Sequence, residues 1–323
     1  MSTPDDPGLA PQFEALMTHA ERFEIARRND PALARAELED LIRVVVGKQA
    51  VIAGRFGETP AIFRIFEDPA NPLAAKEWDE LQRIYPLMQE PPYQVVRPLY
   101  FSKDNGIQIT EKVPGTPLME HLWQLPRRKR LLYIPQSAAW LHSYMGPTLN
   151  QARAYPLHWL RRAEKIAAQQ PFPRLQRCEA AILIEMKRLA RQIKGKTWRR
   201  ALDHGDYHPN NLIATACGLT GIDTGARHMV PIYRDMARFM LHIARRGLTL
   251  SRAHHFGVDK SLFDAFATTF ELDDTEQQIY LPMLLGFDAL TRVESKTLPR
   301  RRIKRAHEIY EMLLEDMRQT APE

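Results

Sequence analysis

The chain has 323 residues, 44% of them hydrophobic, and this length favours two structural units over one. No stretch approaches the roughly 18 uninterrupted apolar residues that a membrane span requires, and the N-terminus has no basic start followed by an apolar run, so we expect a cytoplasmic protein. The net charge of +6 favours anionic ligands, and two distant cysteines, Cys178 and Cys217, expected to be buried thiols, support neither a disulfide framework nor a zinc site.

The first part of the chain is predicted to form two helices and then a small sheet. Apolar residues at helical spacing indicate a helix over residues 10–28, and a second helical stretch is expected up to Asp40. From Leu41, runs of β-branched and aromatic residues predict three antiparallel strands. A helix over residues 73–89 and two further strands, around residues 94–101 and 107–113, complete this small sheet unit.

The remainder is predicted to be mainly helical. The expected helices cover residues 118–125, 127–144, 157–169, 175–194 and 307–317, and one hairpin (NLIATACGLTGID) is set among them. The predicted organisation is an N-terminal helical extension (1–40), a sheet unit (41–112) and a helical unit (113–323).

The segment from His204 to Asp223 carries the strongest chemical signal. It contains an Asp, an Asn after four intervening residues, a hairpin, and a second Asp. Phosphoryl transfer requires a carboxylate that orients the accepting hydroxyl and takes its proton, and metal ions that neutralise the phosphates. Asp206 suits the first task. Asn211 and Asp223 supply oxygen ligands of the kind that Mg²⁺ prefers, so the segment predicts a catalytic base and a magnesium site.

This segment resembles the catalytic loop of the aminoglycoside phosphotransferase and choline kinase family, which commonly reads H-G-D-x-H-x-x-N and is followed by I-D-x-x. The resemblance implies an α+β, two-lobed protein-kinase-like fold, with a small antiparallel five-stranded lobe, one crossing helix and a larger helical lobe. It also implies transfer of the γ-phosphoryl of ATP or GTP, with Mg²⁺, to a hydroxyl of a small molecule such as a sugar or an amino alcohol. His204 and His208 are expected to position the loop, and Asp235 matches the family's Asp that braces it.

The resemblance extends to nucleotide contacts. Backbone groups near Glu111 and Val113 match the hinge that would hydrogen-bond adenine. The family has a Lys that contacts the phosphates and pairs with a Glu of the crossing helix, and AIFRIF places Arg64 there. Glu77 is its expected partner, with Glu80 second. The glycine loop is short, and Lys48 within it is expected to assist phosphate binding.

Two other interpretations stay open. The GDxH string from Gly205 to His208 also occurs in metallophosphoesterases, although their remaining motif segments are absent here. Arg64 and the short glycine loop would also suit a pseudokinase or nucleotide-sensing scaffold, whereas the presence of Asp206, Asn211 and Asp223 together favours an enzyme.

The composition beyond Arg238 bears on the acceptor. Basic residues outnumber acids there and favour a neutral or anionic metabolite over a polycationic aminoglycoside: Arg245, Arg246, Arg252, His254 and His255. Acidic residues from Asp259 to Asp274 lie in the same region, so the acceptor class stays open. The basic run at residues 296–305 has no interleaved aromatic residues, and nucleic-acid binding is therefore not expected.

Overall fold

The structure, a computed structural model, describes residues 9–225 and 228–320 and divides into two compact units. Unit 1 comprises Met1–Gly115 and Thr215–Arg227, and unit 2 comprises Thr116–Ala214 and His228–Glu323. This division differs from the predicted one in two respects. The N-terminal helix belongs with the sheet, and the segment that carries Asp223 belongs to unit 1 although its sequence neighbours on both sides belong to unit 2.

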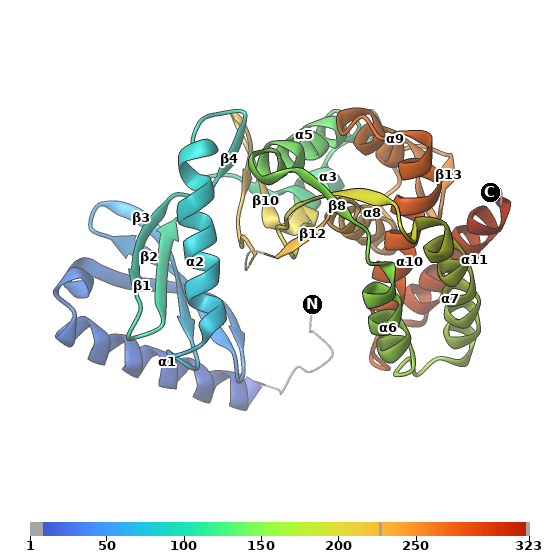
Figure 1. The fold of residues 1–323 in the computed structure, drawn as a ribbon. Coiled ribbons are helices and arrows are strands. Elements are labelled where there is room, and N and C mark those ends of the chain that lie inside the picture. The colour runs from blue at the N-terminus through green and yellow to red at the C-terminus, as the bar shows by residue number, and fades with distance from the viewer. Residues whose placement is uncertain (1–8, 226–227, 321–323) are drawn as a thin grey trace. The chain divides into compact units, whose positions relative to one another are not determined.

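Unit 1 is built around a five-stranded antiparallel sheet with strand order β1-β2-β3-β6-β5 (Figure 1). A short parallel pair, β4 and β11, adds the segment before Asp223 to the same unit. The elements of unit 1 are α1 (Leu9–Asn29), the 3₁₀ helix η1 (Pro31–Arg35), β1 (Ala36–Val45), β2 (Gln49–Phe56), β3 (Thr59–Phe66), α2 (Pro72–Ile84), the 3₁₀ helix η2 (Tyr85–Leu87), β4 (Tyr93–Val95), β5 (Pro98–Ser102), β6 (Ile107–Glu111) and β11 (Gly218–Gly221).

Helices α1 and α2 cover opposite faces of this sheet. Successive side chains of a strand point to opposite faces, and β3 shows the consequence. Phe63 contacts Phe23 of α1, with ring centroids 5.7 Å apart, while the next residue, Arg64, pairs with Glu77 of α2. The core between α1 and the sheet is closed by small and branched side chains of β2, β3 and β6.

The predicted second helix, up to Asp40, is wrong. The chain makes only the 3₁₀ helix η1, whose first turn is capped by the carboxylate of Asp30 accepting from Ala32 N at 3.0 Å. Strand β1 then starts at Ala36, five residues earlier than Leu41, and pairs from Ala36 with Phe56 of β2. Residues 36–40 have ample helical propensity, so this long-range pairing overrides their local preference.

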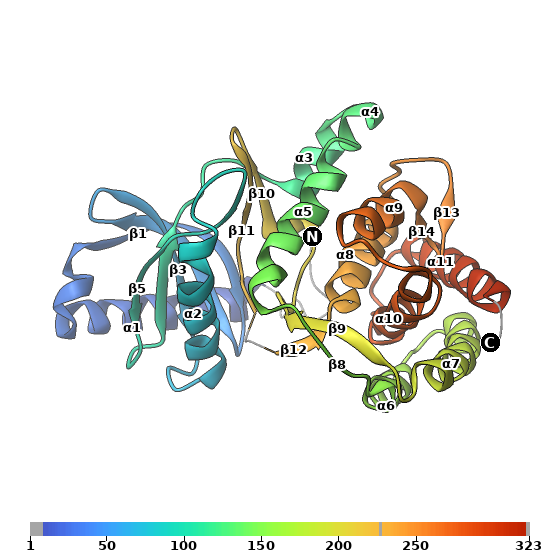
Figure 2. The ribbon, with the colours of Figure 1, turned by 45° about the horizontal axis from the view of Figure 1, so that its top comes forward.

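Unit 2 is mainly helical, with small sheets at its edge (Figures 1 and 2). Strand β9 is the middle strand of a sheet ordered β12-β9-β8, and it leads directly into the loop that contains Asp206. The elements of unit 2 are β7 (Thr116–Pro117), α3 (Leu118–Gln124), α4 (Arg127–Arg130), α5 (Tyr133–Met145), the 3₁₀ helix η3 (Gly146–Thr148), β8 (Asn150–Arg153), α6 (Pro156–Ala167), α7 (Pro173–Ile193), β9 (Thr197–Leu202), the 3₁₀ helix η4 (Pro209–Asn211), β10 (Leu212–Thr215), β12 (Met229–Pro231), α8 (Tyr233–Arg246), β13 (His254–His255), β14 (Val258–Asp259), α9 (Lys260–Thr269), the π-helix η5 (Glu276–Tyr280), α10 (Leu281–Leu290) and α11 (Arg300–Gln319).

Helix α10 forms the centre of unit 2. Every residue from Leu281 to Leu290 is buried, because helices α6, α7, α8 and α11 pack around it. A helix that is apolar on nearly every side, with Asp288 as its one charged residue, requires such burial. None of the helices within residues 9–225 and 228–320 has the length and apolar character needed to cross a lipid bilayer.

The two cysteines lie in different environments. Cys178 on α7 is buried, as expected, whereas Cys217 is exposed in the turn between β10 and β11. The expectation of two buried thiols is therefore wrong for Cys217, because a hairpin turn carries its side chains outside the packed core.

Candidate active site

The loop after β9 brings the predicted catalytic residues of unit 2 together. Gly205 adopts φ +79°, a left-handed conformation that glycine reaches without the steric strain of a Cβ, and it turns the chain just before Asp206. The loop then closes in η4, which ends at Asn211. The side-chain amide of Asn211 donates to the backbone oxygen of Asp206 at 3.0 Å, so the two residues are held side by side and the carbonyl oxygen of Asn211 is the atom suited to bind a metal ion.

Asp235 anchors the start of this loop. Its carboxylate, fully buried in the first turn of α8, accepts a hydrogen bond of 2.7 Å from the backbone N–H of His204. Asp203, the preceding residue, pairs with Arg234 and also lies close to Asp235. Burial and the charge of Asp235 raise the pKa of Asp203 to about 7, although Arg234 opposes the shift. The loop thus begins at two buried carboxylates that share one arginine.

Aromatic side chains fix the middle of the loop. Tyr207 is fully buried and donates its hydroxyl to the backbone oxygen of Ser137 at 2.6 Å. Its ring stacks on Trp140, with centroids 5.5 Å apart, and the ring of His204 packs edge-on against the same Trp140 at 5.7 Å. The ring of His204 is therefore fully buried in an aromatic cluster.

Asp206 is held by two basic side chains. Nε of Arg238, on α8, donates to its Oδ1 at 2.7 Å, and a second guanidinium nitrogen contacts the same oxygen. Nε2 of His208 lies 3.4 Å from Oδ2. Burial favours the neutral acid, but the hydrogen bond from His208 and the charge of Arg238 outweigh it, and the pKa of Asp206 lies well below its ordinary value. Asp206 is therefore a carboxylate at neutral pH.

A second group of predicted residues gathers in unit 1 around Arg64 of β3. One guanidinium nitrogen lies 3.1 Å from Glu77 Oε2, in a contact that is an ion pair rather than an aligned hydrogen bond, and another lies 3.5 Å from Asp223 Oδ1. Burial raises the pKa of Glu77, Arg64 opposes the shift, and Asp223 adds to it. Asp223 is half-exposed and adopts φ +54°, an uncommon conformation that Asp tolerates better than most residues.

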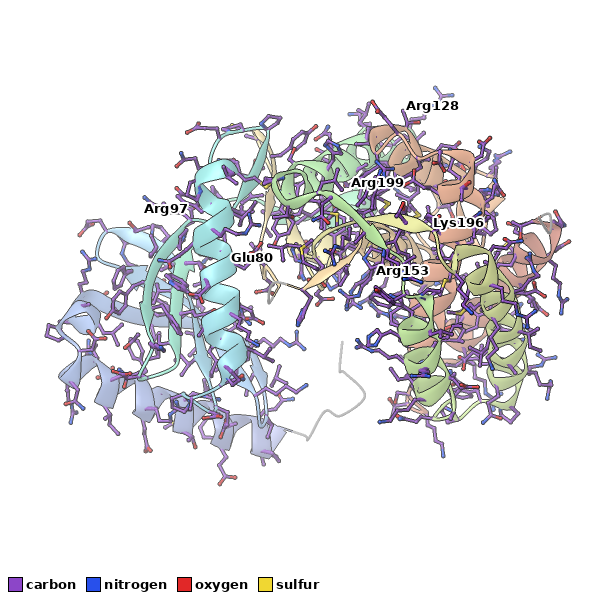
Figure 3. All side chains as sticks on the ribbon, viewed as in Figure 1. Glu80, Arg97, Arg128, Arg153, Lys196 and Arg199 are labelled. Carbon is purple, nitrogen blue, oxygen red and sulfur yellow. The ribbon has the colours of Figure 1, made fainter. Side chains whose placement is uncertain are left out.

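Glu80, the second candidate partner of Arg64, is not its partner. It is fully buried on α2 and pairs with Arg83, its neighbour at i+3, at 2.6 Å. Figure 3 labels Glu80 on this helix. Glu80 points away from the direction of Glu77, because residues three positions apart on an α-helix differ in direction by about 60°.

Three further predicted nucleotide contacts lie at the edges of unit 1. Lys48 is exposed in the turn between β1 and β2, next to Gly47 at φ +74°. Glu111 ends β6, where its carboxylate accepts from Arg97 N at 3.0 Å and its own N–H donates to the oxygen of Arg97. Val113 follows in the link that ends unit 1. Because the side chain of Glu111 is hydrogen-bonded within the protein, only backbone groups here are suited to contact adenine.

Sequence reasoning missed Arg238, His242 and Asp288 as site residues. Arg238 lies between the carboxylates of Asp206 and Asp288, because its guanidinium group contacts Asp206 and one of its nitrogens lies 3.8 Å from Oδ1 of Asp288 on α10. The rings of His242 and His208 are 4.6 Å apart. A sequence signal existed for the α8 residues, because Arg238 and His242 follow Asp235 at i+3 and i+7 and so share its helix face. The sequence spacing gives no indication of Asp288, because this residue lies on another helix, α10.

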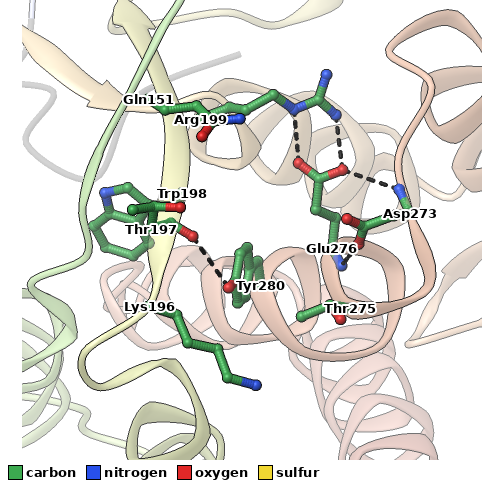
Figure 4. A pocket seen from close by; sticks show the side chains of 9 residues that line it. All are labelled: Gln151, Lys196, Thr197, Trp198, Arg199, Asp273, Thr275, Glu276 and Tyr280. Carbon is green, nitrogen blue, oxygen red and sulfur yellow. Dashed lines mark hydrogen bonds and ion pairs between the residues drawn. The ribbon is translucent and has the colours of Figure 1, made fainter.

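A cavity of about 350 Å³ lies elsewhere in unit 2, between β9 and the π-helix (Figure 4). Its wall contains a closed ion pair, in which Arg199 donates to both oxygens of Glu276 at 2.7 and 2.8 Å. The cavity is lined by Gln151, Lys196, Thr197, Trp198, Arg199, Asp273, Thr275, Glu276 and Tyr280. None of the predicted site residues is among them, so this hollow is separate from the loop of Asp206.

Comparison with solved structures defines the fold class as protein-kinase-like. Choline kinase LicA from Streptococcus pneumoniae is 17% identical with a TM-score of 0.56, and the match covers 89% of this chain and 98% of that one. A glucosamine kinase solved with glucosamine, ADP and inorganic phosphate is 14% identical with a TM-score of 0.55, covering 98% and 84%. ADP-bound aminoglycoside phosphotransferase APH(2'')-Ib is 14% identical with a TM-score of 0.53, covering 92% and 99%.

The family model described as "Phosphotransferase enzyme family" matches residues 49–222, and the chain belongs to this family. A search of curated proteins finds no match. The predicted family resemblance and the two-lobed α+β kinase-like fold are both confirmed.

Proposed function

We propose that this protein transfers the γ-phosphoryl group of ATP, or of GTP, to a hydroxyl group of a small molecule. The carrying observation is the loop of unit 2, in which Asp206 stays ionised beside Asn211 and is anchored through His204 to the buried Asp235. Family membership supports a phosphotransferase, and solved relatives bound to ADP support a nucleotide donor.

Asp206 acts on the acceptor in this proposal. Its carboxylate orients the hydroxyl and accepts the proton as the new oxygen–phosphorus bond forms and the bond to the leaving ADP oxygen breaks. His208 keeps the carboxylate in place through Oδ2. Arg238 holds Oδ1, so the carboxylate has a fixed orientation before any substrate arrives.

Arg64 binds the phosphates of the nucleotide, with Glu77 fixing its side chain from α2. Lys48 assists them, and backbone groups at Glu111 and Val113 bind adenine. Asn211 and Asp223 are the proposed Mg²⁺ ligands, since each offers a side-chain oxygen of the type that this hard cation takes. Within the described residues no three His, Cys, Asp or Glu side chains gather as a metal site, so the protein side chains that would hold the ion in this proposal are Asn211 and Asp223. Bound Mg²⁺ supplies neutralisation of the phosphate charge.

A nucleotide-sensing scaffold without turnover is the second candidate, because Arg64 replaces lysine and pairs with both Glu77 and Asp223. In such a scaffold Arg64 would compete with a metal ion for Asp223. The intact loop around Asp206 favours the enzyme.

Replacement of Asp206 by Asn tests the proposal. Asp206→Asn keeps the side-chain size and removes the proton acceptor, so we expect ADP release with an accepted substrate to fall by about 10²–10⁴-fold. Binding of ATP with Mg²⁺, measured by calorimetry, is expected to stay within about threefold of the unaltered protein. Asp264→Asn, at an exposed acid of α9, is the matched control. Unchanged turnover in Asp206→Asn contradicts the enzyme assignment, and binding without turnover in the unaltered protein supports the scaffold.

A further inference from the structure

A set of buried and partly buried polar side chains lies beside Asp206, between α8 and the end of α10. Arg238, His242 and Arg245 occur at i, i+4 and i+7 on α8, so they share one helix face. Helix α8 packs against α10, which contributes Asp288, and Arg292 follows the last turn of α10. We call these five residues the α8–α10 polar cluster.

The cluster contains several polar atoms without hydrogen-bond partners among residues 9–225 and 228–320. His242 is only 6% exposed, and both of its buried ring nitrogens lack a hydrogen bond to these residues. Oδ2 of Asp288, one guanidinium nitrogen of Arg245 and Nδ1 of the adjacent His208 are likewise unpaired. A buried polar group without a hydrogen bond loses the solvation that it had in water, and native proteins rarely keep several such groups together. These atoms therefore indicate a polar partner other than the described residues.

The charged residues around the cluster indicate the sign of the charge on that partner. Arg245 is balanced by Glu294, and Arg238 lies between Asp206 and Asp288. Within the described parts of the chain, no ion pair joins the side chain of Arg292 or Arg246 to a carboxylate. Burial lowers the pKa of Arg292 despite the opposing effect of Asp288, so the surrounding acids compensate its charge incompletely.

The histidines do not change this balance. Burial, and then the charges of His208, Arg292, Arg246 and Arg238, lower the pKa of His242 to about 2, so its ring is neutral and offers one donor and one acceptor. The arginines whose charge acts on this ring are Arg238, Arg246 and Arg292. Carboxylates compensate Arg238 and Arg245 directly, so Arg292 and Arg246 are the arginines of this region that form no ion pair with a carboxylate among the described residues.

We propose, on the basis of the proposed function, that the acceptor is an anionic hydroxy compound whose carboxylate or phosphate group binds Arg292 and Arg238 in the α8–α10 polar cluster. His242 donates one hydrogen bond to the same molecule and accepts another. Binding of the anion to Arg238 weakens the hold of this arginine on Asp206 Oδ1, which frees that oxygen to accept the proton of the acceptor hydroxyl. That proton moves to Asp206, the acceptor oxygen bonds to the γ-phosphorus, and ADP leaves.

A cationic acceptor suits this cluster poorly. An ammonium group beside the unpaired Arg292 adds repulsion in a poorly solvated place, where charges interact more strongly than in water. The cluster therefore discriminates between acceptors that share a hydroxyl but differ in charge.

A set of small probes tests the proposal directly. Glycerol 3-phosphate, glycerate, glycerol and 2-amino-1,3-propanediol share a hydroxylated three-carbon frame and differ in charge. Binding of each to the full chain is measured by calorimetry in the unaltered protein, in Arg292→Gln and in Arg128→Gln, a matched change at an exposed arginine of α4 (Figure 3). We expect one or both anionic probes to bind at least about tenfold more tightly than glycerol, and this preference to be lost in Arg292→Gln and kept in Arg128→Gln.

Two further measurements distinguish loss of the anion site from loss of folding. Circular dichroism checks that Arg292→Gln folds, and Arg292→Lys, which keeps the charge, is expected to restore part of the anion preference. Equal binding in Arg292→Gln, absence of binding by both anions, or preference for the amine each overturns the proposal. Phosphorylation of a neutral or amine acceptor would leave the proposed function standing while this inference fails. Anion binding at Arg292 without ADP release from any hydroxyl acceptor would leave the anion site standing while the proposed function fails.

Discussion

The hydrogen bond from the backbone N–H of His204 to Asp235 is expected to be the main anchor of the proposed catalytic loop. Asp235→Ala removes a carboxylate that accepts a 2.7 Å hydrogen bond in a fully buried place. Hydrogen bonds to charged groups contribute about 1.5–3 kcal/mol, and the N–H of His204 would stay buried without a partner. Relief of the repulsion between Asp235 and Asp203 offsets part of this loss. We therefore expect a net decrease of about 2 kcal/mol in the free energy of unfolding.

Urea unfolding and the titration of Asp203 measure this effect independently. Asp235→Asn keeps an oxygen acceptor, so it should cost less than about 1 kcal/mol, while both variants should bring the pKa of Asp203 down from about 7 towards its ordinary value. Asp264→Ala removes only an exposed pair with Lys260, worth about 0.3–0.5 kcal/mol, and serves as the control. Equal stability of Asp235→Ala and Asp264→Ala, or an unchanged titration of Asp203, would refute the reasoning.

Two more predictions concern nucleotide binding and pH. Arg64→Ala should weaken binding of ATP with Mg²⁺ by about tenfold in calorimetry, while Arg64→Lys stays within about threefold; equal affinity of all three proteins would exclude Arg64 as a phosphate ligand. Burial raises the pKa of Glu179 from 4.5 to about 7 despite the hydrogen bond from Gln170, so the folded protein keeps a proton that the unfolded chain releases, and this residue lowers stability as the pH rises through that range. Between these pH values the free energy of unfolding, measured with urea, should fall by up to about 3 kcal/mol less in Glu179→Gln than in the unaltered protein. The same pH dependence in both proteins would contradict the raised pKa of Glu179.

The loop that contains Asp206 was predictable from the sequence because its information is local. The spacing from Asp206 to Asn211 and the following hairpin identify the loop, and the matching position of Asp235 indicates the anchor that contacts His204. The pairing of Arg64 with Glu77, which the family resemblance implied, is present in the structure, while the role of both residues in nucleotide binding stays a prediction.

Residues brought together by tertiary packing were not predictable. Residues 36–40 favour a helix locally, yet their pairing with β2 makes them a strand. Asp288 joins Arg238 only because α10 packs on α8, and an apolar helix gives no sequence sign of which polar residue will face a neighbour. The exposure of Cys217 was not predictable either, because it depends on where the hairpin turn lies in the folded protein.

Transfer of labelled phosphate tests the central claim most directly. The protein is incubated with Mg²⁺, ATP carrying heavy oxygen in its γ-phosphoryl group and a library of hydroxyl metabolites that includes acids, neutral sugars, aminoglycosides and choline. Mass spectrometry then follows the label. The account predicts labelled phosphomonoester of an acceptor with the unaltered protein and none with Asp206→Asn. Label found only in inorganic phosphate, or remaining entirely in ATP, would contradict it.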